Sequence, residues 1–264
     1  MKLEFLVPDV VKVAEKAARF IMSEMEGFSP SDIEEKGAND FVSYVDRESE
    51  RIISEGLQRL LPSAGIIAEE ITTTQGEGKY RWIVDPLDGT TNFIHGIHPF
   101  SISIALEGEG ELLAGVVYEA SGREVFTAWK DGGAWLNGKR INVSSAVKLA
   151  DSLVATGFPY KDFSRLQEYL NLLGHLMKTT QGIRRMGSAS LDLSYVACGR
   201  FDIFFEYSLK PWDVAAGTLI VREAGGTVTD FNGRTENITG EEIIASNGIV
   251  HPEMLEIFNN FMHK

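Results

Sequence analysis

The segment VDPLDGTTNF, at residues 84–93, decides how the rest of this chain is interpreted. An apolar strand leads into it, and Pro86 disfavours helical geometry at Asp85, so we expect the strand to end at Asp85. Asp88 lies three positions later and would point to the opposite face of a continuing strand. The two carboxylates can therefore converge only if the chain turns between them, and Pro86 and Gly89 suit such a turn.

A turn of this kind would offer both oxygen ligands and backbone donors. The carboxylates of Asp85 and Asp88 and the free carbonyl of Leu87 are hard ligands that suit Mg²⁺. If residues 89–92 open a helical turn, their N–H groups would suit a phosphate. Taken alone, such a stretch is more often a surface turn in which the aspartate is a local cap than a metal site.

Three further acidic residues stand where they could join this site. Glu69 and Glu70 end the apolar run at residues 64–68, which predicts a short buried strand. Paired acids at a strand end are more often exposed to solvent than bound to a metal. Asp213 stands at the start of a helix rich in small residues, where a plain helix cap is the alternative role.

The charge balance bears on what the chain binds. Among 264 residues, 38 are acidic and 25 are basic, so the formal net charge is −13. That excess argues against a broad basic surface for nucleic acid, and a negatively charged phosphate substrate would need bound cations. No apolar run approaches the roughly 18 residues of a membrane-spanning helix. Cys198, the only cysteine, cannot form an internal disulfide, and we expect a cytoplasmic protein.

The apolar periodicity divides the chain into two lobes. Helical spacing predicts helices at residues 9–25, 46–61, 166–177, 189–197, 213–224 and 252–262. Shorter runs predict strands at residues 80–84, 101–107, 112–119, 124–129, 202–207, 226–230 and 243–245. We expect an antiparallel-rich α+β lobe at residues 1–140 and a mixed α/β lobe at residues 141–264, packed tightly into one functional unit.

Two long motifs place the chain beside a known family. DPLDGTTNF at residues 85–93 and WDVAAGTLIVREAGG at residues 212–226 resemble the two signature segments of inositol monophosphatases. Shorter matches follow the family's order, at residues 40–46, 67–70, 155–159 and 184–189. The resemblance implies a layered αβαβα sandwich, of α+β or α/β class, as in the sugar phosphatases that are similar to fructose-1,6-bisphosphatase.

The resemblance also implies a metal site. Two or three Mg²⁺ ions would be bound by Glu69, Asp85, Asp88, Asp213 and the backbone carbonyl of Leu87. Glu69 is implied to act in catalysis by holding the ion that activates water. Thr90 matches the family threonine that orients this water, and Asp46 matches the acid that hydrogen-bonds the threonine. An N-cap for the following helix is a competing role for Asp46.

Substrate contacts are implied by the same matches. The backbone N–H groups of Gly89 and Thr90 would receive the phosphate, while Asp88 and Asp213 would lie beside the substrate, with Asp213 at the leaving hydroxyl group. Further positions match residues that contact the cyclitol ring, namely Gly187, Ser188, Ala189 and Glu206. Glu206 also stands within an apolar strand, where a carboxylate needs a partner or an opening to solvent.

The implied function is Mg²⁺-dependent hydrolysis of myo-inositol 1-phosphate, or of a similar small phosphorylated polyol, by direct attack of water. Inhibition by lithium and a homodimeric assembly are implied too. Fructose-1,6-bisphosphatase or nucleotide 3′-phosphatase activity is an alternative on the same fold. A regulatory protein that binds the transcription machinery, with residues 182–185 as a partner or dimer surface, is an alternative of another class. The full set of like-charged carboxylates favours catalysis, because a purely binding protein has no physical need for it.

Overall fold

The computed structural model describes residues 2–25, 27–28, 33–37, 40–70, 73–74, 78–159, 162–236 and 239–262. Its helices are α1 (Leu3–Met25), α2 (Tyr44–Leu60), α3 (Thr90–Ile94), α4 (Leu166–Thr179), α5 (Ala189–Ala197), α6 (Pro211–Glu223) and α7 (His251–Met262), with a 3₁₀ turn at Leu149–Asp151. Its strands are β1 (Ile33–Gly37), β2 (Asp40–Ser43), β3 (Gly65–Ala68), β4 (Thr73–Thr74), β5 (Tyr80–Asp88), β6 (Ser101–Gly108), β7 (Glu111–Glu119), β8 (Glu124–Trp129), β9 (Gly133–Leu136), β10 (Lys139–Ile141), β11 (Leu153–Thr156), β12 (Gly182–Arg184), β13 (Ile203–Tyr207), β14 (Thr227–Thr229) and β15 (Glu242–Ser246).

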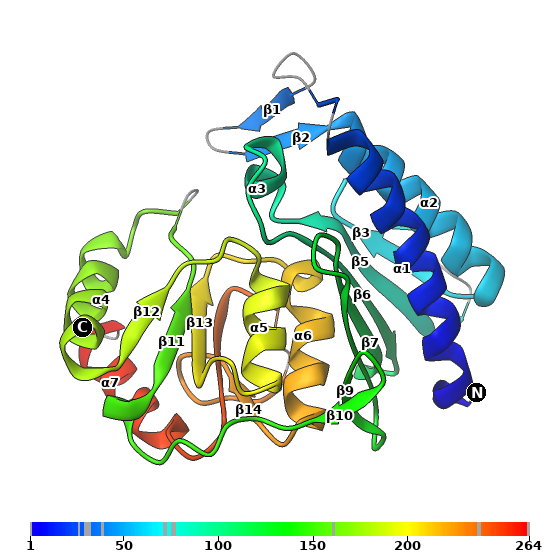
Figure 1. Cartoon of the computed structure of the whole chain (residues 1–264). Coiled ribbons are helices and arrows are strands. Elements are labelled where there is room, and N and C mark those ends of the chain that lie inside the picture. The colour runs from blue at the N-terminus through cyan, green and yellow to red at the C-terminus, as the bar shows by residue number, and fades with distance from the viewer. Residues whose placement is uncertain are drawn as a thin grey trace.

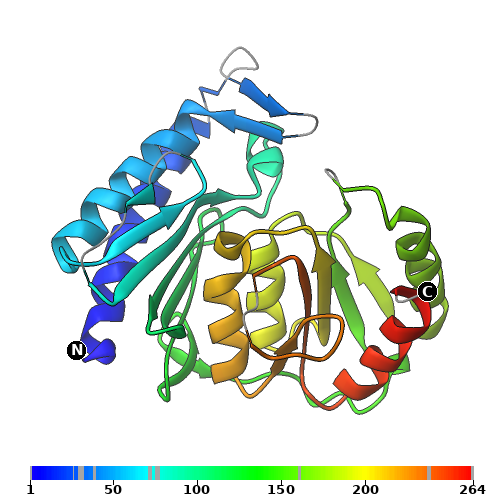
Figure 2. The ribbon, with the colours of Figure 1, turned by 180° about the vertical axis from the view of Figure 1, so that it is seen from behind.

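The helices and strands stack in layers (Figures 1 and 2). α1 and α2 cover the outer face of an eight-stranded sheet with the order β10-β9-β8-β7-β6-β5-β3-β4. α5 and α6 lie between this sheet and a five-stranded sheet with the order β12-β11-β13-β15-β14. α4 and α7 cover the far face of the smaller sheet. The layered αβαβα sandwich predicted from the sequence is confirmed.

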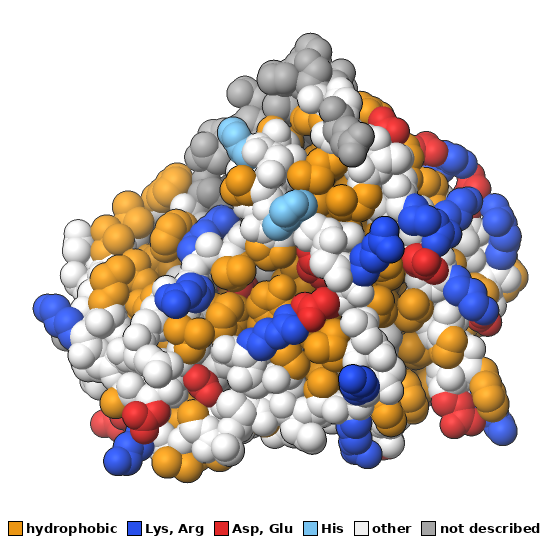
Figure 3. Space-filling view, viewed as in Figure 1, with side chains coloured by type: hydrophobic (Ala, Val, Ile, Leu, Met, Phe, Trp, Pro, Cys, Tyr) orange, Lys and Arg blue, Asp and Glu red, His pale blue; other side chains and the backbone are white. Residues whose placement is uncertain are grey.

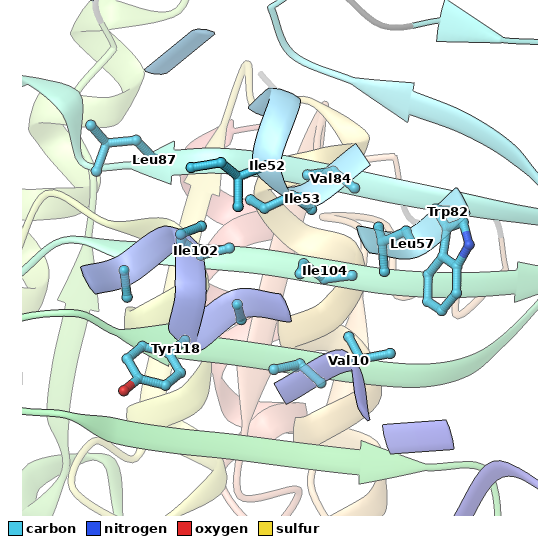
Figure 4. Close-up of a cluster of buried hydrophobic side chains, with 14 of the residues drawn as sticks. Val10, Ile52, Ile53, Leu57, Trp82, Val84, Leu87, Ile102, Ile104 and Tyr118 are labelled. Carbon is cyan, nitrogen blue, oxygen red and sulfur yellow. The ribbon is translucent and has the colours of Figure 1, made fainter. Parts of the chain in front are cut away.

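Hydrophobic cores fill the spaces between these layers. Successive side chains of a strand point to opposite faces. In β5, Trp82 and Val84 therefore pack under the outer helices, whereas Ile83 faces the central helices. Figure 4 shows Val84 and Trp82 on the sheet close to Ile53 and Leu57 of α2. Burying an aliphatic side chain of this size stabilises the fold by about 1.5–3 kcal/mol, so β5 is anchored on both faces just before it reaches Asp85.

The two sheets differ in strand direction. The larger sheet is antiparallel apart from the β3–β5 pair. The smaller sheet mixes parallel pairs of β11 with antiparallel pairs of β15. We propose residues 1–140 and 141–264 as the two lobes, since the larger sheet ends with β10 near that boundary. In the described ranges, none of the helices combines the length and apolar character that crossing a bilayer requires.

Several elements differ from the sequence-based prediction. α1 begins at Leu3 rather than at residue 9, because Pro8 removes only the one helical hydrogen bond that its missing N–H would donate. β9 and β10 form a hairpin where the sequence-based prediction has no strand. β11 and β12 are also absent from the prediction. Strands of three or four residues contain too little alternation for a periodic pattern to reveal them.

A buried histidine joins α7 to the smaller sheet. His251 Nδ1 lies 2.8 Å from Ser246 Oγ, and His251 Nε2 lies 3.0 Å from Thr229 Oγ1. Burial lowers the pKa of His251 to about 4. The imidazole is therefore neutral in the folded chain at pH values where an unfolded histidine is already charged.

This histidine is expected to make the fold sensitive to mild acid. Above about pH 6.5 both states hold a neutral imidazole, so His251 adds no pH dependence. As the pH falls from 6.5 towards 4, only the unfolded chain gains the proton, and the free energy of unfolding decreases by about 2–3 kcal/mol. Urea unfolding at pH 7 and pH 4.5 measures this loss. In His251→Gln the pH-dependent loss should shrink by that amount, and an equal loss in both chains would contradict the assignment.

Candidate active site

A cavity of about 310 Å³ opens at one edge of the layered stack. β5 and α3 border it from the larger sheet, and the first turns of α5 and α6 border it from the central layer (Figure 1). The residues expected to bind metal or substrate line this one cavity: Glu69, Asp85, Leu87, Asp88, Gly89, Thr90, Gly187, Ser188, Ala189, Glu206 and Asp213. Asp46 stands behind the cavity and reaches it through Thr90.

Acidic side chains from distant parts of the sequence meet in this cavity. Asp85 is buried, and its pKa is raised well above the ordinary value by burial and by the negative charges of Glu69, Asp88 and Asp213. An effect of three separate charges on one carboxyl requires the four groups to be near neighbours. Within the described part of the chain, no three acidic, His or Cys side chains are close enough to form a ready-made metal group. The carboxylates surround a shared space rather than a closed coordination shell.

The donor set fits a hard divalent cation. Carboxylates and a backbone carbonyl are the oxygen ligands that Mg²⁺ prefers, and Leu87 borders the cavity between Asp85 and Asp88. Like charges disfavour one another's ionised form, whereas a cation among them favours it. A divalent cation bound among these carboxylates would offset their mutual repulsion.

An irregular end of β5 brings Asp85 and Asp88 to the cavity together. Both residues pair with β6, and the register shifts between them. Pro86 has no N–H to donate, and Leu87 N donates to Asp85 Oδ1 at 3.0 Å. The predicted strand end at Asp85 is therefore wrong. The change of direction that the two acids require is a β-bulge within a continuing strand.

α3 begins directly after this bulge, as expected for the helical turn at residues 89–92. Gly89 has φ +96°, in the left-handed region that favours glycine. A Cβ at Gly89 would lie 3.2 Å from both Gly187 O and Phe100 Cβ. The first N–H groups of a helix have no partner within it, so the start of α3, at Gly89 and Thr90, borders the cavity with backbone donors.

Asp46 connects α2 to Thr90. Its Oδ1 accepts a hydrogen bond from Thr90 Oγ1 at 2.9 Å, and Leu87 O lies at the same distance from this hydroxyl oxygen. Its Oδ2 accepts from Ser43 N at 2.8 Å and from Ser43 Oγ at 2.6 Å. Ser43 is thus the N-cap, and Asp46 is the third-position acid of a capping box rather than the cap itself. Burial raises the pKa of Asp46. One carboxylate serves both the helix and the threonine.

The same face of α2 holds two more segments of the site. Ser49 Oγ donates to Pro86 O at 2.8 Å, and Glu50 Oε2 accepts from Glu70 N at 2.8 Å. Ser49 and Glu50 follow Asp46 by three and four positions, which places all three on one helix face. Sequence reasoning missed both contacts. The only signal in the sequence is the set of polar residues that recurs at helical spacing along one side of α2.

The far wall of the cavity contains Glu206 and Asp213. Burial raises the pKa of Glu206 to about 8, although the charge of Arg185 acts in the opposite direction. A Cβ at Gly157 would lie 1.9 Å from Glu206 Oε1, so this glycine makes room for the carboxylate. Asp213 Oδ2 accepts from Lys210 N at 2.7 Å. Asp213 therefore supports the start of α6 and lines the cavity as well.

Two charged residues that line the cavity were not expected there. Arg185 and Asp192 both contribute to the wall near Glu206. Asp192 is buried, and its Oδ1 finds no hydrogen-bond partner among the residues described. Burial, followed by the charges of Glu206 and Asp88, raises the pKa of Asp192 well above its ordinary value. The signal that could have identified it is that Asp192 is the one charged residue of the buried helix α5.

Comparison with known proteins agrees with this fold. A model described as the inositol monophosphatase family matches residues 3–263, and the chain belongs to that family. The inositol-1-monophosphatase of Rhizobium meliloti is 47% identical over 223 residues, which cover 84% of this chain and 84% of that protein. The Nus factor SuhB of Escherichia coli is 43% identical over 246 residues, covering 93% of this chain and 92% of that protein.

Two solved structures are closely similar over nearly the whole chain. The extragenic suppressor protein SuhB of Bartonella henselae has a TM-score of 0.89 at 42% identity and covers 95% of this chain and 97% of its own. An IMPase of Thermotoga maritima has a TM-score of 0.88 at 37% identity, with 99% and 98% covered. The relatives thus include proteins named as phosphatases and proteins named as Nus factors.

Proposed function

We propose that this protein is a Mg²⁺-dependent phosphomonoesterase that hydrolyses myo-inositol 1-phosphate or a similar small cyclitol or sugar monophosphate. One observation carries the proposal: four carboxylates from three separate segments, those of Glu69, Asp85, Asp88 and Asp213, line a single cavity beside the start of α3. Membership of the inositol monophosphatase family supports it. The metal ligands would be Glu69, Asp85, the Leu87 carbonyl, Asp88 and Asp213.

The proposed reaction is a direct attack of water on phosphorus, in line with the leaving alkoxide. When bound, Mg²⁺ supplies charge for the phosphate and lowers the pKa of a bound water. Thr90 Oγ1 donates a hydrogen bond to Asp46 Oδ1. A lone pair of the same hydroxyl oxygen would then accept a hydrogen bond from the attacking water. Glu69 stands beside the same space, and its carboxylate would orient the water from the other side.

The remaining wall would bind the substrate. The N–H groups of Gly89 and Thr90 would receive the phosphate, and Asp213 would contact the leaving hydroxyl group. Ring hydroxyls would meet the polar groups of Asp88, Gly187, Ser188, Ala189 and Glu206. The cavity of about 310 Å³ is at the small end of ligand pockets, which favours a single phosphorylated ring over a nucleotide.

A phosphate-release screen tests the proposal. The panel contains inositol 1-phosphate, glycerol 2-phosphate, fructose 1,6-bisphosphate and adenosine 3′,5′-bisphosphate, each with Mg²⁺ and with EDTA. We expect release from the cyclitol phosphate with Mg²⁺ and none with EDTA. Preference for the bisphosphates would support the fructose-1,6-bisphosphatase or nucleotide 3′-phosphatase alternatives. Release that persists in EDTA would contradict the metal assignment.

Lithium is expected to inhibit. Li⁺ is a small hard cation that competes for oxygen ligands but carries half the charge of Mg²⁺, so it would occupy a site without supporting the reaction. In about 10 mM lithium chloride, phosphate release should fall several-fold at limiting Mg²⁺. Potassium chloride at equal ionic strength is the control. Equal rates in both salts would place the protein in another branch of phosphatases.

We also propose a cytoplasmic homodimer. The names of the bacterial relatives and the free thiol of Cys198 support the compartment. Apolar side chains gather on the left of Figure 3, where α4 lies in Figure 1. The exposed large apolar side chains of α4 are Leu166, Leu170 and Met177. An exposed apolar stripe of this kind is typical of an interface. Analytical ultracentrifugation of the chain tests the assembly state.

A second candidate function, the binding of transcription complexes, has support from the relatives alone. Proteins named Nus factor SuhB or putative Nus factor SuhB are 43–44% identical over 90% or more of this chain. Such a role would not require hydrolysis of a phosphate ester. A variant without phosphatase activity, such as Asp85→Asn, should still bind purified transcription elongation complexes if that role exists, and loss of binding together with activity would argue against two functions.

A further inference from the structure

One oxygen of Asp88 is held by a group of buried serines. Asp88 Oδ2 accepts hydrogen bonds from Ser188 Oγ at 2.7 Å, from Ser190 N at 2.8 Å and from Ser190 Oγ at 2.6 Å. Behind them, Ser101 Oγ lies 3.1 Å from Ser188 Oγ and 2.8 Å from Ser190 Oγ. All three serines and Asp88 are buried. All three donors to Asp88 come from the start of α5, and Ser101 of β6 contacts only the two serine hydroxyls.

The start of α5 shows that this arrangement is unusual for a helix. Ser188 is the N-cap, a position where a serine hydroxyl ordinarily accepts from the first turn. Its side chain makes no cap hydrogen bond, and the hydroxyl donates to Asp88 instead. Asp88 in turn accepts from Ser190 N, which belongs to the first turn of α5. A carboxylate from 100 residues earlier therefore performs the capping role.

We propose that Ser101, Ser188 and Ser190 form a serine cradle that positions Asp88 for cation binding by fixing Oδ2. This inference rests on the proposed function. A carboxylate oxygen has about two lone pairs, so three donors saturate Oδ2. Asp88 would then bind a cation through Oδ1 alone, with its side-chain rotation fixed.

A purely structural account of these serines fits the contacts less well. A buried serine hydroxyl needs a partner, and Ser194 shows how α5 supplies one locally. Ser194 Oγ donates to Ser190 O at 2.8 Å, within the helix's own backbone. Ser190 is on the same helix, one turn earlier, yet its hydroxyl donates to Asp88. Ser194 is therefore a matched control, equally buried and without contact to Asp88.

Titration calorimetry with Mg²⁺ alone, without substrate, tests the cradle on the full chain. Partners that orient a metal ligand typically change metal affinity by about 10–100-fold. We expect Ser190→Ala to weaken Mg²⁺ binding by about tenfold. Ser101→Ala should weaken Mg²⁺ binding by about two- to threefold, because the Ser101 hydroxyl acts on Asp88 only through the other two serine hydroxyls. Ser194→Ala should bind Mg²⁺ as the parent does. Thermal melting of each variant separates a loss of stability from a loss of affinity.

The possible outcomes are distinct. Parental Mg²⁺ affinity in Ser190→Ala overturns the cradle alone, and so does an equal loss in Ser194→Ala, since that would reflect general loosening of α5. If Ser190→Ala does not fold, Ser101→Ala decides, and parental affinity there overturns the proposal. A parent chain that does not bind Mg²⁺ overturns the proposed function and the cradle with it. The proposal is supported if the loss of Mg²⁺ affinity is largest in Ser190→Ala, smaller in Ser101→Ala and absent in Ser194→Ala.

Discussion

Replacing Asp85 by asparagine is expected to lower phosphate release about a thousandfold or more while the metal-free chain stays at least as stable as the parent. The loss follows because a metal site contributes several kcal/mol of charge stabilisation in the transition state, and each 1.4 kcal/mol is about a tenfold change in rate. The stability follows from the charges around Asp85. Glu69, Asp88 and Asp213 all disfavour its ionised form, so a neutral amide relieves repulsion instead of breaking an ion pair.

Three measurements check this prediction: the rate of phosphate release at saturating Mg²⁺, urea unfolding in EDTA, and the rise in melting temperature on adding Mg²⁺. Asp202→Asn is the matched control. Asp202 is also a buried acid, but it accepts from Ser144 Oγ and from Leu153 N and does not line the cavity. That variant should lose about 1–3 kcal/mol of stability and keep its rate. Parental activity in Asp85→Asn would show that the acids serve another purpose.

The parts of the fold that follow from local pattern could be predicted. α5 has the predicted bounds, residues 189–197, because its length and composition suffice to identify a helix. Strands β7 and β8 match within a residue, because each is a run of six or more residues rich in apolar, β-branched and aromatic side chains. The layered order could not be derived from periodicity. It came from the resemblance to a family, and the packing of α5 and α6 between two sheets confirms it.

The features that could not be predicted depend on contacts between residues that are far apart in the sequence. The end of β5 was placed too early, because the bias against helix before Pro86 does not distinguish a strand end from a bulge. Ser49 and Glu50 act on segments that lie far from α2 in the sequence. The direction of the Ser188 hydroxyl, towards Asp88 rather than its own helix, is invisible in sequence, because an N-cap serine predicts the opposite.

The position of the cavity explains why acids can gather there. Helix starts carry partial positive charge and unpaired N–H groups. The first turns of α5 and α6 contact Asp88 and Asp213 respectively, and Asp46 completes a capping box on α2. Each of these carboxylates is therefore stabilised by a helix start, at the cavity wall for Asp88 and Asp213 and behind it for Asp46. The fold offsets part of the mutual repulsion, and a cation would offset the rest.

Replacing Thr90 by valine is expected to lower the turnover rate about a hundredfold without weakening Mg²⁺ binding. Valine keeps the shape of threonine but removes the hydroxyl that donates to Asp46 Oδ1. Orientation of a reacting water by a positioned side chain contributes about 10²–10⁴-fold to rate. The carboxylates that would bind Mg²⁺ are unchanged, so the affinity measured by calorimetry should stay parental. Thr90→Ser restores the hydroxyl and should recover most of the rate.

Thr91→Val separates this role from a general effect on α3. Thr91 also lines the cavity and stands next to Thr90, but it is exposed and does not contact Asp46. Its rate should stay within about threefold of the parent's, the range expected for an exposed site. Equal losses in both variants would mean that α3 tolerates no β-branched apolar residue. A turnover rate unchanged in Thr90→Val would show that the Thr90–Asp46 hydrogen bond has no part in the reaction. The role of Asp46 would then be confined to the capping box at the start of α2, which does not involve Thr90.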